Sequence, residues 1–225
     1  MSVPEPITFE SFYWFGARQN PHEETPIETA PENPTNKRPV LVFDTETTGL
    51  AGHDVAIQLA YSLDTGHEGV SETMKYLKLP RGVYISRRAA SVHKITASIL
   101  INKAVDVEPV LQSFFDSCER VITSGGLVVA HNAAFDRRII EQTASRHAVP
   151  LPKWWPEDRH FFCTMRSSSA FCTLLTDKGR KKQFKNDELY KYFTGEFPKL
   201  ELHDALNDVR VTLSNYRQGE CREMW

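Results

Sequence analysis

The pattern of hydrophobic and polar positions predicts four strands, three of them before residue 80. Uninterrupted apolar runs at Val40–Phe43 and Leu127–Ala130 predict strands that are buried on both faces. Apolar stretches at Asp54–Asp64 and Glu72–Leu79 predict two more strands. Glycine-containing turns separate the runs that begin at Val40, Asp54 and Glu72, as a meander of neighbouring strands requires.

Helical spacing dominates the second half of the chain. Apolar residues recur at i, i+3, i+4 and i+7 across Val107–Ser124, which predicts an amphipathic helix that ends before two glycines. Further helices are predicted at Phe135–Arg146, Thr164–Phe171, Asp187–Phe193 and about Asp204–Arg217. Three strands followed by alternating helices and strands indicate an α/β domain with a mixed sheet. Such sheets place their functional sites at the carboxyl ends of the strands.

The first 38 residues differ in composition from the rest of the chain. Six prolines recur there, and residues 1–36 contain six acidic side chains and one basic side chain. We therefore interpret residues 1–38 as a Pro-rich acidic extension, residues 39–217 as the folded domain and residues 218–225 as a tail. The aromatic run Phe9–Phe15 would be costly to expose to water, so it is expected to pack on the domain or to bind a protein partner.

Composition narrows the class of protein. A chain of 225 residues with 40% hydrophobic and 25% charged residues is typical of a globular domain. It has no apolar run of the roughly 18–20 residues that would cross a bilayer and no secretory signal pattern, so we expect an intracellular, cytoplasmic or nuclear protein. The four cysteines are widely spaced, which favours reduced thiols. Outside residues 1–36 there are 26 basic and 23 acidic residues, a balance that suits a polyanionic partner.

Acidic residues occur at three places, and the predicted fold would bring the first two to one edge of the sheet. Asp44 and Glu46 are two residues apart in a strand, so both side chains point to one face and would repel unless a cation intervenes. Asp136 follows the strand Leu127–Ala130 and falls in the first turn of a helix; Asp208 falls in the last predicted helix. Taken singly, each has a plainer explanation: an exposed strand end, a helix N-terminus favoured by the dipole, or a solvated helix face.

Taken together, the three segments resemble a known family. Asp44–Leu50, then His131-Asn132 with Phe135-Asp136, then His203 with Asp208 closely resemble the three exonuclease motifs of the DnaQ-like DEDDh family. The resemblance spans about residues 39–217. It implies a ribonuclease-H-like fold, a mixed five-stranded sheet flanked by helices. The spacing from His203 to Asp208 is similar to the histidine branch, because Asp204 stands where the other branch has tyrosine.

The resemblance also implies a chemistry for these residues. Asp44, Glu46, Asp136 and Asp208 would hold two Mg²⁺ ions, for which Mn²⁺ can substitute, and His203 would take a proton from the attacking water. Imidazole titrates near neutral pH, which suits a general base. Thr47, Leu50, Asn132 and Phe135 match positions that line the nucleotide pocket in relatives, and core packing is the alternative for Leu50 and Phe135.

Two weaker features accompany these motifs. Val92–Thr96 resembles a family segment beside the terminal nucleotide, so His93 is a candidate substrate contact, although Lys94 replaces the usual glycine there. Cys163-Thr164-Met165 resembles the start of a family helix. The densest basic run, Lys178–Lys185, is either a solvated loop or a surface that contacts phosphates upstream of the cleaved bond.

The resulting prediction is a metal-dependent 3′–5′ exonuclease. It would release nucleoside 5′-monophosphates from single-stranded or frayed 3′ ends, with DNA favoured, in proofreading or repair. The alternatives are an RNA-trimming 3′–5′ exoribonuclease, for which the 2′-hydroxyl would decide sugar choice, and a nucleic-acid-binding or polymerase-docking module without catalysis. The complete acidic set counts against the third, because a pure binding module has no need for four clustered acids near phosphates.

Overall fold

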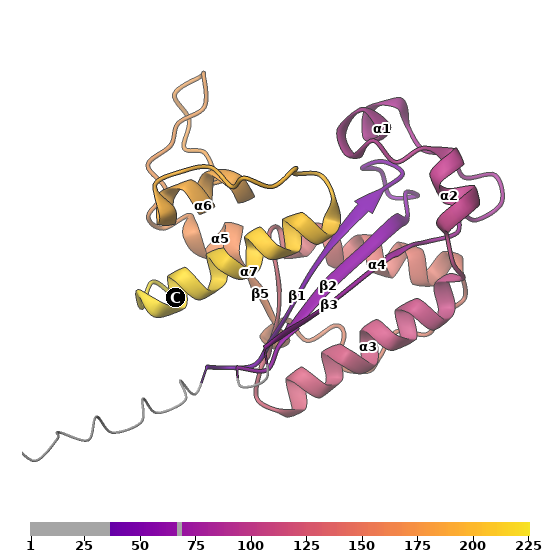
Figure 1. Cartoon of the computed structure of the whole chain (residues 1–225), viewed down its shortest axis with the longest axis horizontal. Helices are drawn as coiled ribbons and strands as arrows, with labels where there is room; N and C mark the ends of the chain where they lie inside the picture. The colour runs from indigo at the N-terminus through magenta and orange to yellow at the C-terminus, as the bar shows by residue number, and fades with distance from the viewer. Residues whose placement is uncertain (1–36, 67–68) are drawn as a thin grey trace, which may run out of the picture. The chain divides into compact units, whose positions relative to one another are not determined.

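The computed structural model describes residues 37–66 and 69–225. The prediction for the aromatic run Phe9–Phe15 lies outside these residues. Five strands form one mixed sheet in the order β3-β2-β1-β4-β5 (Figure 1). The strands are β1 (Val40–Thr47), β2 (Ala56–Asp64), β3 (Val70–Tyr76), β4 (Leu127–Ala130) and β5 (Phe161–Cys163). The expected mixed five-stranded sheet is therefore confirmed.

The sheet combines an antiparallel meander with two parallel strands. β1 pairs antiparallel with β2, and β2 with β3, whereas β4 runs parallel to both β1 and β5. The carboxyl ends of β1, β4 and β5 consequently meet at one edge of the sheet. The predicted range Glu72–Leu79 was two to three residues late, because β3 is an edge strand whose outer positions are exposed and carry little apolar signal.

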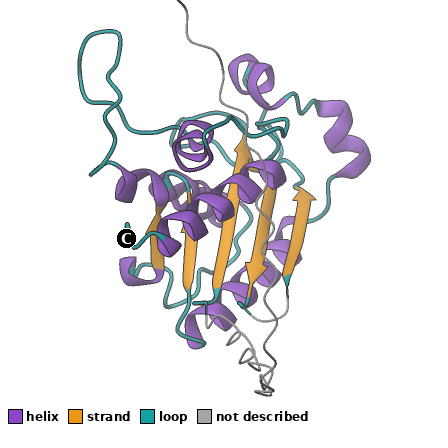
Figure 2. Cartoon of the chain, turned by 60° about the vertical axis from the view of Figure 1, so that its left-hand side comes forward, coloured by secondary structure: helices purple, strands orange, loops and turns teal. Residues whose placement is uncertain are grey.

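Helices cover both faces of the sheet (Figure 2). The helices are α1 (Arg87–His93), α2 (Ala97–Lys103), α3 (Val107–Thr123), α4 (Ala133–Arg146), α5 (Thr164–Ser168), α6 (Asn186–Thr194) and α7 (Ala205–Cys221), with a 3₁₀ turn at Asp158–His160. One core joins Leu41 and Phe43 of β1 to the apolar faces of α3 and α4. A second core joins Val40 and Val42 to α7. Because side chains alternate along a strand, the even positions of β1 face α7.

Three elements were not placed by the hydrophobic pattern. α1 and α2 have seven residues each and are largely exposed, so their apolar periodicity is too short to detect. Both begin at a side-chain cap: the hydroxyls of Ser86 and Thr96 accept hydrogen bonds from backbone N–H groups in the first turn. β5 has three residues, which is below the length at which strand alternation can be recognised.

The last helix is longer than expected. α7 was predicted to end near Arg217 and runs to Cys221. The expected tail then turns back, and the Trp225 indole N–H donates to the Tyr216 carbonyl at 3.2 Å. The Trp225 ring also packs on Phe162, with ring centroids 5.5 Å apart. These aromatic contacts fasten the C-terminal residues to the α7 side of the sheet.

Candidate active site

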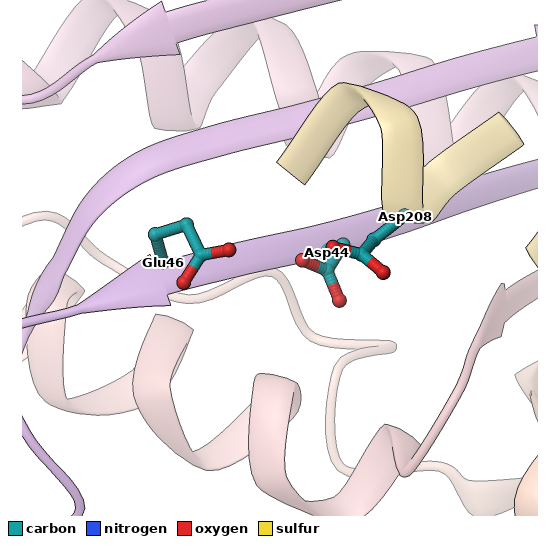
Figure 3. Close-up of side chains that lie close together, drawn as sticks. All are labelled: Asp44, Glu46 and Asp208. Carbon is teal, nitrogen blue, oxygen red and sulfur yellow. The ribbon is translucent and has the colours of Figure 1, made fainter. Parts of the chain in front are cut away.

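Three carboxylates converge on the face of the sheet that α7 covers. Asp44 and Glu46 lie on β1 at even positions, and Asp208 lies in the first turn of α7. One carboxylate oxygen from each of the three lies within 4.8 Å of the others (Figure 3). Alternation along β1 provides the first two acids, whereas the third depends on where α7 crosses the sheet.

Asp136 is not one of these three acids; it approaches them from the α4 side of β1, close enough for its charge to raise the pKa of Asp44. It is fully buried in the first turn of α4. Its Oδ1 accepts hydrogen bonds from the backbone N–H and the hydroxyl of Thr45, at 3.2 and 2.8 Å. Thr45 stands between Asp44 and Glu46, so these bonds hold Asp136 at the edge of the trio. No local sequence pattern marks Thr45 as a positioning residue.

Burial and mutual repulsion raise the pKa of every one of these acids. Burial raises the pKa of Asp44 well above its usual range, and the charges of Asp136, Asp208 and Glu46 add to this effect. Burial and the charge of Asp208 raise the pKa of Glu46 to about 8. Burial raises the pKa of Asp136 to about 7, although the hydrogen bonds from Thr45 oppose the rise. Burial also raises the pKa of Asp208, and the hydrogen bond from the His203 backbone N–H partly opposes this rise.

This donor set fits divalent cations. Among residues 37–66 and 69–225, no lysine or arginine forms an ion pair with any of the four acids. Partly buried carboxylates without a cationic partner are costly, and hard ions such as Mg²⁺ bind oxygen ligands of this kind. The arrangement could therefore concentrate positive charge beside a bound phosphodiester.

His203 lies at the mouth of the site. Its backbone N–H donates to Asp208 Oδ2 at 2.8 Å, and its backbone is left-handed with φ 65°. The residue is exposed, in the turn directly before α7. Asp204 caps α7, since its Oδ1 accepts from the backbone N–H groups of Leu206 and Asn207. The turn thus leaves the His203 ring facing solvent beside the carboxylates.

The predicted nucleotide-pocket residues gather around the ends of β1 and β4. Thr47 is buried, and its hydroxyl donates to the Gly49 carbonyl at 2.7 Å. Leu50 is 63% exposed, so the core-packing alternative does not hold for it. Phe135 packs partly against the core. Arg138 links the two, with its guanidinium 3.4 Å from the Leu50 carbonyl and 5.3 Å from the centre of the Phe135 ring. Asn132 lines a cavity of about 560 Å³ that also includes Asp208.

His93 has a different environment from the one expected of a free ligand. Its ring is buried, Nδ1 accepts from the Ile95 N–H at 2.9 Å, and Nε2 donates to the Thr47 carbonyl at 3.1 Å. Burial, the largest effect, lowers the pKa of His93, in keeping with a neutral ring. Both nitrogens therefore serve the backbone, and His93 ties the end of β1 to α1. Lys94, where the family pattern has glycine, adopts a left-handed conformation with φ 59°.

Gln58, which no motif in the sequence marks, positions α7. It is fully buried on β2, opposite Glu46 in the strand register. Its amide N–H donates to Asp204 Oδ2 at 3.2 Å, and its carbonyl accepts from the Ala205 N–H at 3.1 Å. The available clue was a large polar residue inside the apolar run Ala56–Tyr61.

The sequence of this chain matches a known protein family over most of its length. The RNase_T family model, described as "Exonuclease", matches residues 41–216. The chain belongs to this exonuclease family. This confirms the resemblance to DnaQ-like DEDDh exonucleases that the three motifs indicated.

Curated and solved members extend the comparison. Exodeoxyribonuclease 10 of Escherichia coli K12 is 28% identical over 174 residues, covering 76% of this chain and 64% of the relative. Exonuclease I from Methylocaldum szegediense superposes with a TM-score of 0.64 at 18% identity, over 82% of this chain and 41% of that chain. E. coli Exonuclease I in complex with a dA16 oligonucleotide gives 0.61 at 17% identity, over 83% and 42%. These structures share the exonuclease fold, and this chain spans less than two thirds of each relative.

Proposed function

We propose that this protein is a divalent-metal-dependent 3′–5′ exonuclease that removes nucleoside 5′-monophosphates from single-stranded or frayed DNA ends. The observation that carries the proposal is the convergence of Asp44, Glu46 and Asp208 within 4.8 Å, with Asp136 hydrogen-bonded to Thr45, which stands between Asp44 and Glu46 on β1. Membership of the exonuclease family supports the reaction class. The preference for DNA is supported by the name of the curated relative, an exodeoxyribonuclease, and by the DNA-bound Exonuclease I structure.

Each residue has a role that follows from its place. The four carboxylates would hold two Mg²⁺ ions, which when bound would offset the negative charge that develops on the attacking and leaving oxygens. His203, exposed beside Asp208, would accept the proton of the attacking water. Leu50 and Phe135 would pack against the last base, and Asn132 would contact the nucleotide next to it. Such apolar packing against an unpaired base favours single-stranded ends.

The wider assignments are part of this proposal. The exonuclease unit would comprise residues 39–217. Proofreading or repair would be the setting if DNA is the substrate, and RNA trimming if RNA is. An intracellular location is part of the proposal. Separately, no helix in the part of the chain that the structure describes is long and apolar enough to span a membrane.

The test is digestion of matched DNA and RNA oligonucleotides, single-stranded and duplex, with Mg²⁺ or Mn²⁺ or with EDTA. Label at the 3′ end should be released as a mononucleotide, single-stranded DNA should be degraded fastest, and EDTA should stop the reaction. Asp44→Asn is the matched control, since it keeps the side-chain shape and removes one ligand charge. Wild-type turnover in Asp44→Asn, or binding of the oligonucleotide without any release, would contradict the proposal; faster digestion of RNA would select the exoribonuclease alternative.

A further inference from the structure

Residues 173–183 form a hairpin that stands out from the domain between α5 and α6. We call it the basic hairpin; it is the orange loop that rises above α5 and α6 in Figure 1. Its two arms are joined by backbone hydrogen bonds from Lys182 to Leu174 at 2.9 Å and from Thr176 to Arg180 at 2.8 Å. The turn closes through Gly179, whose φ of 69° suits glycine. Residues 173–181 are all exposed, so the hairpin buries no core of its own.

The charge of the hairpin is concentrated at its tip. Lys178, Arg180 and Lys181 are exposed, and none of the three forms an ion pair with any acid that the structure describes. Lys182, nearer the base, pairs with Glu188 of α6. Asp177 is the one acidic residue between Thr173 and Gln183. Three cations and one acid leave the protruding turn with a net positive charge, which favours an anionic ligand.

The base of the hairpin is fixed to the active-site edge of the sheet. His131, directly after β4, donates from Nε2 to the Phe184 carbonyl at 3.0 Å. Its Nδ1 then accepts from the Thr164 hydroxyl at 2.9 Å. Burial lowers the pKa of His131 to about 4, so the ring is neutral at pH 7 and keeps this pattern. His131 is adjacent to Asn132, so the hairpin and the start of α4 have a common anchor.

A groove leads from the carboxylates to this base. The 560 Å³ cavity that includes Asp208 and His203 is also lined by Gln183 and Lys185, on the hairpin's returning arm and just beyond it. A second cavity of about 240 Å³ shares Asn132, Met165 and Gln183 with the first and extends to Arg166 and Arg137. Leu50 and Phe135, the residues proposed to pack on the last base, line neither cavity, whereas Asn132 lines both. The groove is therefore separate from the surface proposed for the last base.

We propose that this groove carries the substrate strand on the 5′ side of the cleaved bond, and that Lys178, Arg180 and Lys181 hold its backbone phosphates. The inference rests on the proposed function, because it needs the 3′ end to sit at the carboxylates. Contacts of long cationic side chains with phosphates add affinity that is independent of base sequence and falls with salt. The hairpin would therefore act on strands long enough to reach it and leave the chemistry at the terminal bond unchanged.

The test compares substrates that reach the hairpin with one that does not. The variant is Lys178→Ala/Arg180→Ala/Lys181→Ala, which alters exposed residues and should fold normally. Hydrolysis of a p-nitrophenyl ester of thymidine 5′-monophosphate should stay within about twofold of wild type. For a single-stranded 20-nucleotide DNA, KM should rise about tenfold at 100 mM NaCl with kcat unchanged, and the slope of log KM against log salt should fall by about 2, at roughly 0.7 per lost phosphate contact.

The matched control removes three cations at the opposite edge of the sheet. Lys37, Arg38 and Arg120 are exposed there, beside the amino end of β1, and the triple alanine variant should leave KM for the 20-nucleotide DNA unchanged. An unchanged KM in the hairpin variant, or an equal rise in the control, would overturn the hairpin proposal. If wild type hydrolyses neither substrate, the proposed function fails instead, and fluorescence anisotropy with the same DNA in metal-free buffer still decides the hairpin: equal affinity of wild type and variant would overturn it.

Discussion

Backbone conformation at single residues shapes this site as much as side-chain chemistry does. His203, Asn132 and Lys94 all have positive φ, at 65°, 71° and 59°. Asn132 and His203 each stand at the start of a helix that carries a site acid. The left-handed turn changes the chain direction sharply, which lets Asp136 and Asp208 enter the site one turn later. Asparagine tolerates this conformation better than most residues, whereas lysine does not.

For His203 the useful substitution is asparagine rather than alanine. His203→Asn keeps a residue suited to φ 65° and keeps the backbone N–H that binds Asp208. It removes only the imidazole, so we expect kcat to fall by about 10²–10⁴, the range for a lost general base, with thermal stability nearly unchanged. The measurements are single-turnover digestion of 3′-labelled DNA and thermal unfolding. A rate within threefold of wild type would remove His203 from the mechanism.

Replacement of Lys94 with glycine is expected to stabilise the folded protein. A left-handed conformation costs a residue with a Cβ roughly 1–2 kcal/mol, and Lys94 is exposed at the end of α1. Part of the gain is lost to the greater freedom of glycine in the unfolded chain. We expect Lys94→Gly to raise the free energy of unfolding by about 0.5–1 kcal/mol and Lys94→Val to lower it. Urea titration followed by circular dichroism measures the free energy of unfolding of both variants. A Lys94→Gly protein less stable than wild type would contradict the claim that Lys94 is strained.

At the scale of elements, the site depends on how α7 is placed over β1 and β2. β1 carries Asp44 and Glu46 on its even face, and this face meets α7. Gln58 sits beside Glu46 in the strand register and holds the first residues of α7 with two hydrogen bonds. Asn186 of α6 adds a bond from its amide to the Asp208 carbonyl at 3.1 Å. The position of Asp208 is therefore determined by polar contacts with two other elements.

Replacement of Gln58 should affect both stability and rate. Gln58→Ala removes the hydrogen-bond partner of the Ala205 N–H and of Asp204 Oδ2. We therefore expect the free energy of unfolding to fall by about 1–3 kcal/mol. It should also lower kcat at saturating Mg²⁺, because Asp208 would no longer be held in register with Asp44. The matched control is Ser62→Ala on the same strand, since the fully buried Ser62 hydroxyl has no hydrogen-bond partner among the described residues. Equal effects of the two substitutions would show that Gln58 has no special role.

At the scale of the molecule, negative charge is collected at one site of an otherwise mildly basic domain. The four site acids are partly or fully buried, and the exposed cations of the basic hairpin stand beyond the groove. Such a distribution would hold a nucleic acid by its phosphates while the site itself demands cations. In the absence of metal the carboxylates repel one another, so part of the folding free energy is lost at the site.

The stability of the metal-free protein should therefore depend on pH. Burial and the neighbouring acids raise the pKa of Glu46 to about 8 and that of Asp136 to about 7. The stabilising contribution of the two protonated groups is therefore complete below about pH 4, where the same groups also hold protons in the unfolded chain. This contribution is lost as pH rises through 7–8. Tm in EDTA should fall between pH 6 and pH 9, and Mg²⁺ should raise Tm more at pH 8 than at pH 6.

The control for this titration is a change of charge away from the site. Asp44→Asn should flatten the fall in Tm and weaken the effect of Mg²⁺, whereas Asp116→Asn, at an exposed position of α3, should change neither. Differential scanning fluorimetry across pH measures all three proteins. A Tm in EDTA that rises from pH 6 to pH 9 would mean that the site acids are not strained by their charges.

Local sequence carried the elements with strong periodicity and the order of the motifs. β1 and β4 could be predicted from uninterrupted apolar runs, and α3 and α4 from the helical spacing of their apolar residues. Asp44 and Glu46 share a face because side chains alternate along a strand. α1, α2 and β5 could not, because three to seven residues hold too little pattern. The convergence of Asp208 with Asp44, the pairing of Thr45 with Asp136, and the anchoring of Gln58 to α7 join residues 91 to 164 positions apart in the chain. Such contacts arise only from packing, since no local rule relates the register of β2 to the start of a helix nearly 150 residues later.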